Sequence, residues 1–351
     1  MNTRITGTGS AIPTHVVKNN DFNQHTFLDE HGESFQIPAQ EIIEKFSSIT
    51  GIHERKYAPA QVNSSDLAAE AAQKAIDNAQ VNPEELDYLI VAHNFGDTPS
   101  GCTQSIPLPS IASKVKTLLG IANPNCVAYD LLFGCPGWVE GVIQAQAYIR
   151  ASMAKKCLVI GTETLSRVVD PVDRDGMIFA DGAGAVIVEA QDEQGGILSH
   201  KSVTHTANNE IDMLYFDVSY DPNNTTKYIK MKGRKVYEFA LKEVPTAMKA
   251  CLDAAGVRID QVKKIFLHQA NMKMDEAIVK RFFRLYKHPV PETVLPMNIQ
   301  TNGNSSVATI PTLYDQVLND KIEGHHIHKG DIILFASVGA GMNINAICYQ
   351  F

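Results

Sequence analysis

Hydrophobic positions along the chain follow two periods that alternate. Residues 71–93 read AAQKAIDNAQVNPEELDYLIVAH, where apolar residues recur every three to four positions before a polar turn and an unbroken apolar run. The first spacing predicts an amphipathic helix, and the unbroken run predicts a buried strand. A helix followed by a buried strand is typical of α/β proteins, in which helices cover mixed, largely buried sheets.

The same unit occurs a second time. Residues 247–269, AMKACLDAAGVRIDQVKKIFLHQ, align without a gap with residues 71–93 at an offset of 247 − 71 = 176 residues. A period this long excludes a solenoid, whose repeats span about 20–50 residues. The pattern indicates an internal duplication in which each half runs helix, strand, helix, strand, glycine turn, strand. Two further matches keep the same order: 156–161 with 331–336, and 182–188 with 339–345.

The boundary between the halves is expected in a polar stretch that contains glycine. Residues 191–196 read QDEQGG and separate the two repeats. We therefore expect two α/β domains, residues 1–190 and 191–351. Within the first, Asp181–Ala185 (DGAGA) lacks the lysine of a phosphate-binding loop and the spacing of a dinucleotide fingerprint. We interpret it as a tight connection between strands.

Composition and charge exclude several classes of protein. Apolar residues make up 44% of the chain and charged residues 20%, which indicates a globular rather than a disordered protein. The net charge of −8 disfavours a nucleic-acid partner. No run approaches the ~20 apolar residues of a membrane helix, and the first residues lack the apolar core of a signal peptide. Six cysteines without a CxxC pair argue against disulfides and zinc, and for a reducing, cytoplasmic location.

One cysteine has the setting of a nucleophile. Cys135 lies in the sequence DLLFGCPGW, after a short apolar stretch and before the helix-like run 139–151. A thiol at a helix N-terminus feels the positive end of the helix dipole, which lowers its pKa and favours the reactive thiolate. Pro136 suits the first turn of that helix, and Trp138 is expected in the core. The alternative is a buried cysteine that acts as a small hydrophobic residue.

Two further polar segments lie where chemistry collects in α/β folds. The strand of the second repeat ends in LHQAN, which places His268 at the carboxyl end of a strand, where ligands often bind. Residues 302–311, NGNSSVATIP, form a polar turn that leads into a helix. A structural histidine and an ordinary helix cap also explain these segments. If the fold brings them together, Cys135, His268 and Asn304 supply a nucleophile, an imidazole and an amide.

A set of short motifs is spread along nearly the whole chain. They are TGIHER (50–55), Cys135 in its loop, SRVVDPVDR (166–174), ADGAGA (180–185), MKG (231–233), HQAN (268–271) and NGNSS (302–306). Through these motifs the chain resembles β-ketoacyl-acyl-carrier-protein synthase III, a condensing enzyme of the thiolase superfamily. The resemblance implies a thiolase fold, in which duplicated αβ halves give a layered αβαβα architecture. It assigns the catalytic triad to Cys135, His268 and Asn304.

The resemblance also implies a reaction. Cys135 would attack an acyl thioester and hold the acyl group while a malonyl thioester loses carbon dioxide. His268 and Asn304 would donate hydrogen bonds to the enolate oxygen, and the backbone N–H groups of Cys135 and Ala340 would form the oxyanion hole. The expected partners are acyl-CoA, malonyl-acyl-carrier protein and a second copy of the chain. No metal or other cofactor is expected.

The substrate-binding residues depart from the family pattern. Family members usually clamp the adenine of coenzyme A with Trp and Arg, where this chain has Lys45 and Ile49. Leu108, in the long segment 93–109, stands where an aromatic residue often closes the acyl pocket, and 23–40 resembles an insertion near the entrance. These departures predict primers longer than acetyl and a carrier protein as a competent acyl donor. The expected substrate-binding residues are Arg167, Gly233, Arg234, Asn271, Leu108, Lys45 and Ile49.

Other interpretations stay open at this point. The same fold serves condensing enzymes that join two acyl thioesters without decarboxylation, or that act in secondary metabolism. A different class is a non-catalytic subunit that binds acyl chains or a carrier, although the presence of all three triad residues speaks against it. The sequence HHIH (325–328) has the residue types of a zinc site, but its place before Lys329 and Gly330 favours a solvated loop.

Overall fold

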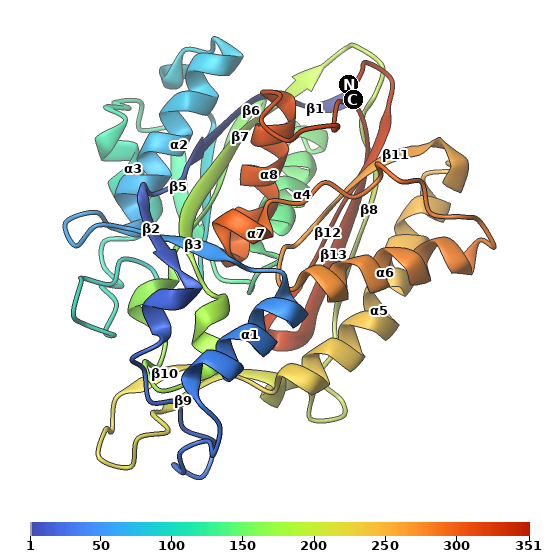
Figure 1. Ribbon diagram of the computed structural model, residues 1–351. Coiled ribbons are helices and arrows are strands. Elements are labelled where there is room, and N and C mark those ends of the chain that lie inside the picture. Colours follow the sequence, from blue (N-terminus) through green and yellow to red (C-terminus); the bar gives the residue numbers. More distant parts are fainter. Residues whose placement is uncertain (1) are drawn as a thin grey trace.

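The structure, a computed structural model, describes residues 2–351 and contains two central β-sheets (Figure 1). In spatial order the first sheet consists of β1 (Asn2–Ala11), β7 (Asp181–Gln191), β6 (Lys156–Thr164), β4 (Tyr88–Ala92) and β5 (Val127–Leu131). The second consists of β11 (Val262–Leu267), β12 (Ile332–Gly339), β13 (Asn343–Gln350) and β8 (Gly196–Thr204). Two short pairs lie outside these sheets: β2 (His15–Lys18) with β3 (Glu54–Tyr57), and β9 (Leu214–Val218) with β10 (Lys227–Met231).

The two sheets repeat one topology. The order β1-β7-β6-β4 in the first sheet corresponds to β8-β13-β12-β11 in the second. In each, the last two strands are parallel and the other neighbours are antiparallel. β5 extends the first sheet only. The predicted duplication is thus present at the level of strand order, and the strands before and after residues 191–196 belong to different sheets.

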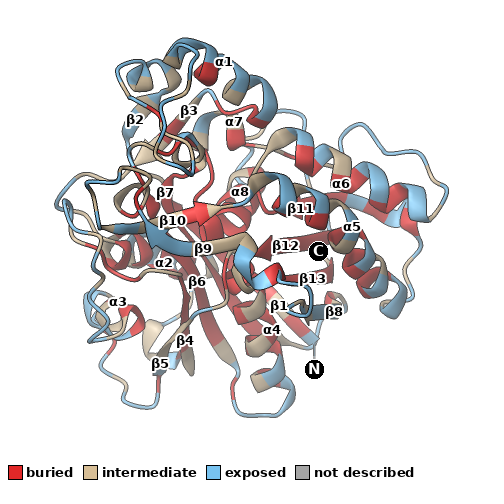
Figure 2. Cartoon of the chain, turned by 90° about the horizontal axis from the view of Figure 1, so that it is seen from below, coloured by how far each residue is buried: buried red, intermediate tan, exposed pale blue. Residues whose placement is uncertain are grey.

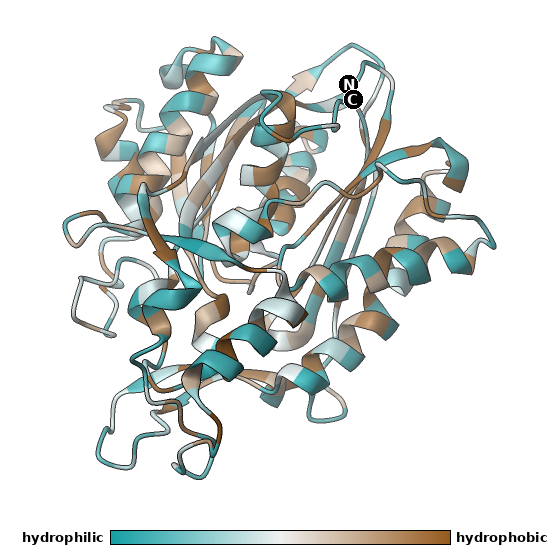
Figure 3. Cartoon of the chain, viewed as in Figure 1, coloured by the Kyte–Doolittle hydropathy of each residue, from teal (hydrophilic) through white to brown (hydrophobic). Residues whose placement is uncertain are grey.

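Helices form three layers around the two sheets, which confirms the predicted αβαβα architecture (Figures 1 and 2). α2 (Ser64–Ala79) and α3 (Ile111–Leu118) cover the outer face of the first sheet. α5 (Gly233–Ala254) and α6 (Met272–Leu285) cover the outer face of the second. Between the sheets lie α4 (Gly137–Arg150) and α8 (Thr309–Leu318), whose buried side chains, Trp138 among them, pack on both. Apolar residues follow the helix faces that meet the sheets (Figure 3).

One predicted turn is a strand. Gly182 and Gly184 lie inside β7, so the interpretation of Asp181–Ala185 as a connection is wrong. A Cβ atom on Gly184 would lie 2.7 Å from the Cβ of Pro311 in α8, so the glycine allows a helix to pack directly on the strand. In the second half the matched sequence is a turn, because Gly341 has a φ of 75° between β12 and β13. The repeats therefore correspond in topology, while this third match was out of register.

A peripheral lobe covers one end of both sheets. It contains the segment before α1 (Ala39–Thr50) and the pair β9–β10, which lie together at the bottom of Figure 1. Phe27 is buried in a cluster with Ile42, Ile43 and Met177. The predicted insertion 23–40 is therefore packed against the body of the protein. None of the helices in residues 2–351 combines the length and the apolar character that a membrane span requires.

Candidate active site

A cavity of about 760 Å³ lies where the peripheral lobe meets the ends of the central strands and helices. Its walls are mainly apolar, and Cys135, His268 and Asn304 all line it. These residues come from three separate parts of the chain: the loop from β5 to α4, the end of β11, and the segment between α7 (Ile299–Asn302) and α8. The structure thus brings the predicted triad together. Their assignment as catalytic residues stays a prediction.

Cys135 precedes the central helix α4, whose N-cap is Pro136. The thiol accepts a hydrogen bond of 3.2 Å from the hydroxyl of Ser306, which also lines the cavity. Burial nevertheless raises the pKa of the Cys135 thiol to about 11. The expectation of a lowered pKa is therefore wrong for the resting protein, because desolvation outweighs the interactions that favour the thiolate. A nucleophilic role for Cys135 therefore requires that the thiol is deprotonated in the course of the reaction.

His268 follows β11 directly, and its ring has a defined hydrogen-bond partner. Nδ1 lies 2.8 Å from the hydroxyl oxygen of Thr309, which donates its own proton to the carbonyl of Ser306 at 2.9 Å. Because that hydroxyl proton is already used, Nδ1 is the donor, and Nε2 of a neutral ring carries the lone pair. Burial lowers the pKa of His268 to about 4, which makes the ring neutral at pH 7. A donor role for Nε2 therefore requires a second proton.

Asn304 is fixed by both its backbone and its amide. Its N–H donates to the carbonyl of Ile178, and its carbonyl accepts from the N–H of Ala180. The side-chain oxygen accepts a 2.8 Å hydrogen bond from the N–H of Ser306. With Oδ1 occupied, the NH₂ group is the part of the amide that is free to act as a donor. This orientation agrees with the predicted role of Asn304 toward an enolate oxygen.

The loop of Cys135 touches the turn that contains Ala340. A Cβ atom on Gly339 would lie 2.5 Å from the backbone nitrogen of Cys135, and one on Gly134 would lie 2.9 Å from that of Ala340. Only glycine permits this approach, and Gly134 also has a φ of 67°. The two predicted oxyanion-hole amides therefore come from segments in direct contact. Ala340 lines the cavity and lies outside the residues with positive φ, so its Cβ is accommodated.

Comparison with known proteins decides the family. Residues 129–206 match the family 3-oxoacyl-[acyl-carrier-protein (ACP)] synthase III, and residues 252–351 match its C-terminal domain. A β-ketoacyl-[acyl-carrier-protein] synthase III from Porphyra purpurea is 31% identical over 360 residues and covers 100% of both chains. This chain belongs to the β-ketoacyl-acyl-carrier-protein synthase III family. A relative from Neisseria meningitidis serogroup A is 33% identical and covers 99% of each chain.

Solved structures agree with this synthase III assignment. The 3-oxoacyl-[acyl-carrier-protein] synthase III from Aquifex aeolicus gives a TM-score of 0.82 at 28% identity, covering 99% of this chain and 100% of that chain. The synthase III from Thermus thermophilus gives the same TM-score and identity and covers 99% of each chain. The predicted thiolase fold and the enzyme class, an acyltransferase of the ketosynthase type, are confirmed.

Five of the predicted substrate-binding positions of this synthase line the cavity. Lys45 and Ile49 lie on α1, on the side of the peripheral lobe. Gly233 and Arg234 begin α5, and the Arg234 guanidinium is exposed beside Glu238. Asn271 caps α6 through a hydrogen bond from the N–H of Met274. Lys45 and Arg234 give this part of the lining two positive charges, and the residues at positions 45 and 49 carry no aromatic ring that could stack on an adenine.

Two of the predicted binding residues do not line the cavity. Arg167 is not among the residues that line the cavity, and its two terminal nitrogens donate to acceptors of the surrounding loops, which tie these loops together. Leu108 is 81% exposed on the outer loop and is absent from the cavity of its own chain. The part of the long segment that carries Leu108 is exposed, and Asp97 and Thr98 earlier in it are buried. Because such a loop borders the acyl pocket partly across a dimer interface in the family, the roles of Arg167 and Leu108 in substrate binding stay predictions. The acceptors of Arg167 are Asn63 Oδ1 and the carbonyls of Pro59, Val62 and Thr98.

Sequence reasoning missed three residues of the site. Ser306 was part of the motif NGNSS but received no role, and it contacts the thiol directly. Asn94 lies two residues after the buried strand β4, and a polar side chain at the end of a buried strand was the signal that could have identified it. Glu163 lies inside the buried strand β6 and is 1% exposed. A charged residue in an apolar strand was the available signal.

The histidine-rich sequence 325–328 forms a loop, as predicted. His326 Nδ1 lies 2.9 Å from Asp320 Oδ1 at the surface. Within residues 2–351 the structure contains no group of three or more His, Cys, Asp or Glu side chains that could hold a metal ion.

Proposed function

We propose that this synthase condenses an acyl group held on Cys135 with a malonyl thioester. The observation that carries the proposal is the convergence of Cys135, His268, Asn304 and two contacting backbone amides on one apolar cavity. In the first step Sγ attacks the thioester carbonyl, the tetrahedral oxyanion forms at the N–H groups of Cys135 and Ala340, and the carbon–sulfur bond of the donor breaks. The free Nε2 of His268 takes the thiol proton and passes it to the leaving thiolate.

The second step consumes one proton from solvent, which protonates Nε2 of His268. The malonyl carboxylate leaves as carbon dioxide, and its bonding electrons form an enolate that faces Nε2–H of His268 and the amide of Asn304. The enolate carbon attacks the acyl carbonyl, a carbon–carbon bond forms and the bond to Cys135 breaks. The proton on Nε2 then returns the Cys135 thiolate to the thiol. All electrons come from bonds of the two substrates, so the proposed reaction uses no metal or redox cofactor.

We propose acyl-CoA or acyl-carrier protein as donors and malonyl-acyl-carrier protein as the extender. The cavity offers an acyl chain an apolar wall, since Phe95, Leu165, Phe179 and Ile229 cluster there. Each additional buried CH₂ of a primer contributes about 0.8 kcal/mol, which favours primers longer than acetyl. The absent adenine clamp weakens coenzyme A without affecting the pantetheine arm. The six cysteines are all free, which supports a reducing cytoplasmic location.

A homodimer is part of the proposal. Leu108 and Leu132 are 81% and 67% exposed, and Ile106 is also exposed in the segment that carries Leu108. Large apolar side chains exposed on two loops, the segment 93–109 and the connection from β5 to α4, are typical of a protein interface. Leu132 lies three residues before Cys135, so the interface would adjoin the nucleophile. Sedimentation should show a dimer, and Leu108→Asp should shift it to the monomer; a monomeric parent at all concentrations would contradict this.

The decisive test is mass spectrometry of the intact protein after exposure to acyl-CoA and acyl-carrier thioesters of two to ten carbons. We expect one acyl group per chain, located on Cys135 by peptide mapping. Values of kcat/KM for acetyl, hexanoyl and decanoyl donors on both carriers then define the primer. Acylation of another cysteine would overturn the mechanism, and a strong preference for acetyl-CoA would overturn the primer and donor assignments alone.

A further inference from the structure

Ser306 is hydrogen-bonded to two members of the triad and is linked to the third through Thr309. Its hydroxyl donates to Cys135 Sγ at 3.2 Å, its N–H donates to Asn304 Oδ1, and its carbonyl accepts from the threonine that holds His268. The residue has a φ of 52°, a left-handed conformation that is unfavourable for a side chain with a Cβ atom. Such a conformation persists only where surrounding contacts maintain it. Ser306 therefore has an unfavourable backbone conformation at the position from which its hydroxyl reaches the Cys135 thiol.

The hydroxyl of Ser306 has a second partner, which determines where its proton points. Asn94 Nδ2 donates to Ser306 Oγ at 2.9 Å. A hydroxyl has one proton, and with Oγ accepting from Asn94 that proton is free to donate to the sulfur of Cys135. If the amide were reversed, its oxygen would face Ser306 and accept the same proton. The orientation of Asn94 thus decides whether the thiol receives a hydrogen bond.

Glu163 fixes that orientation. Its Oε1 accepts from both the backbone N–H of Asn94, at 2.7 Å, and the side-chain Nδ2, at 2.6 Å. A carboxylate oxygen cannot donate to a reversed amide, so the observed arrangement is favoured. Burial raises the pKa of Glu163 to about 7, but Oε1 stays an acceptor when the proton is on Oε2. The arrangement therefore holds in both protonation states.

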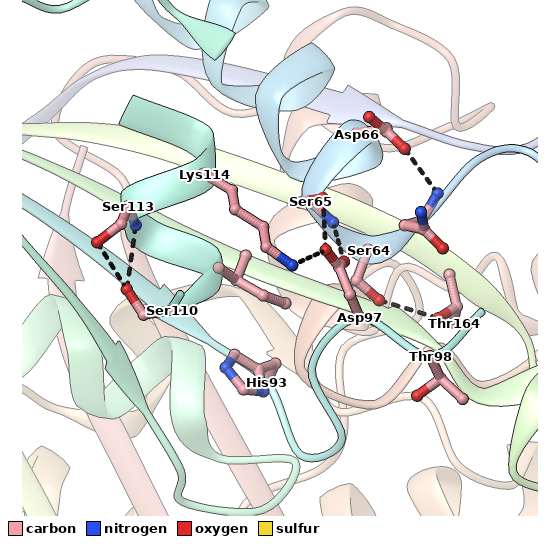
Figure 4. Close-up of polar contacts among 12 residues, drawn as sticks. Ser64, Ser65, Asp66, His93, Asp97, Thr98, Ser110, Ser113, Lys114 and Thr164 are labelled. Carbon is pink, nitrogen blue, oxygen red and sulfur yellow. Dashed lines mark hydrogen bonds and ion pairs between the residues drawn. The ribbon is translucent and has the colours of Figure 1, made fainter. Parts of the chain in front are cut away.

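The segment that carries Asn94 is itself anchored. Asp97, three residues later, accepts hydrogen bonds from the N–H and the hydroxyl of Ser65 at the start of α2, both at 2.8 Å. Lys114 of α3 lies 2.9 Å from the same carboxylate (Figure 4). These contacts tie the loop after β4 to two helices of the outer layer. The backbone is therefore fixed before Asn94 by β4 and after it by the contacts of Asp97.

We propose that Ser306 stabilises the thiolate of Cys135 during acyl loading, and that Asn94 and Glu163 are positioning residues that direct its hydroxyl to the sulfur. The inference rests on Cys135 being the nucleophile, as proposed above. A hydrogen bond to a charged acceptor is stronger than one to a neutral acceptor, so the bond from Ser306 favours the thiolate over the thiol. It acts against the desolvation that raises the pKa of this thiol.

The test is the alkylation rate of each cysteine by iodoacetamide as a function of pH, resolved by peptide mass spectrometry. This readout follows the thiolate and requires no turnover. Ser306→Ala should lower the rate at Cys135 about 10-fold at every pH of the rising limb, which corresponds to a rise of about one pKa unit. Ser306→Gly should do the same without the strain of a positive φ, and it covers the case in which Ser306→Ala fails to fold.

Two controls accompany these variants. Ser305→Ala removes the adjacent buried hydroxyl, whose side chain faces Gly182, and should leave the rate at Cys135 unchanged. The exposed Cys102 should react at the same rate in every variant. If Cys157, buried in β6, became reactive, the variant would be unfolded and would be replaced by Ser306→Gly.

The role of Asn94 is tested through its dependence on Ser306. Asn94→Ala should lower the alkylation rate of Cys135 about 3-fold. The double variant with Ser306→Ala should react no more slowly than Ser306→Ala alone, because Asn94 acts on the thiol only through the hydroxyl of Ser306. Additive effects would show that Asn94 acts independently of Ser306, and an unchanged rate in both Ser306 variants would overturn the whole inference. If the parent acylates a different cysteine, the proposed function has failed instead, whatever the alkylation rates show.

Discussion

The two halves of this synthase place a histidine at the same point and use it differently. His93 follows β4 directly and His268 follows β11, the corresponding strand of the second sheet. Nε2 of His93 lies 3.0 Å from a carboxylate oxygen of Asp130 on the neighbouring β5, and the residue is absent from the cavity. His268 has a hydroxyl partner, and the second sheet has no strand corresponding to β5 among the described residues. The duplicated backbone thus places a histidine at the same strand end in both halves. Whether that histidine pairs with a carboxylate depends on the neighbouring strand β5, which, within residues 2–351, only the first sheet has.

The central helices show the same division of roles. α4 precedes β6 and α8 precedes β12, so their N-terminal ends correspond, and both face the cavity. The proposed nucleophile, Cys135, lies just before the first helix, and Ser306, which donates to its thiol, lies just before the second. One half therefore provides the thiol and the other provides the hydroxyl that donates to it.

The largest expected effect distinguishes these two helix ends. Cys135→Ser should abolish acyl loading, because a hydroxyl cannot replace the thiol as nucleophile in this desolvated site. Ser306→Gly should still load acyl groups, at a reduced rate. Intact-mass measurements after exposure to a hexanoyl thioester check both, and acyl mass on Cys135→Ser would contradict the assignment.

The next effect distinguishes the two histidines. His268→Ala and Asn304→Ala should each load acyl groups but lower the rate of condensation on the order of 10²–10³, the usual effect of one lost donor to an oxyanion. His93→Gln, at the corresponding strand end, should leave the ratio of condensation to loading unchanged. Release of carbon dioxide from malonyl-acyl-carrier protein is the measurement. Parent-like release in the His268 variant would remove the proposed difference between the halves.

The neutral state of His268 predicts a dependence of stability on pH. Its pKa is lowered by burial to about 4 in the folded protein, below the unfolded value of 6.5. As the pH falls below 6.5 the unfolded chain binds a proton that the folded chain does not, so stability is lost until about pH 4. The lost stability amounts to about 3 kcal/mol. The free energy of unfolding of the parent, relative to His268→Gln, should fall by this amount between pH 7 and pH 4; a constant difference would show that folding does not lower the pKa of the ring.

The smallest effect concerns the contact between a strand of the first half and a helix of the second. Gly184→Ala should destabilise the protein by about 1–3 kcal/mol, because the added methyl group would overlap Pro311 and the backbone of α8. Gly182→Ala is the matched control two residues earlier on β7, where the same atom would meet its nearest neighbours at 3.6–3.7 Å. Chemical denaturation measures both. Equal stabilities would mean that α8 can move away from the strand.

Much of the fold was predictable from the sequence because the duplication is visible in residues 71–93 and 247–269, which form α2–β4 and the end of α5 with β11. The glycines of β7 led to the wrong prediction of a turn, because a sequence does not distinguish a glycine that allows a helix to pack closely on a strand from a glycine that forms a turn. The triad positions were accessible through the motifs around them. The contacts of Arg167 and Leu108 were not, because they depend on which loops surround these residues in space.

The electrostatic properties of the site were equally inaccessible. A helix N-terminus before Cys135 predicts a thiolate, but the desolvation that opposes it comes from residues distant in the sequence. Asn94 and Glu163 are 69 residues apart and meet only because β4 and β6 are neighbours in the sheet. Long-range pairs of this kind leave no periodic signal.

The order in which the strands are made differs from the order in which they lie. β7 sits between β1 and β6, and β13 sits between β8 and β12; each is later in the chain than both of its neighbours. On the ribosome each sheet therefore exists for a time with an empty slot, bordered by two strands whose backbone N–H and C=O groups have no partner. Because the two slots have the same strand order and direction on either side, the strand of one half matches the slot of the other. Exchange between the halves is avoided if the first slot closes before the second is presented.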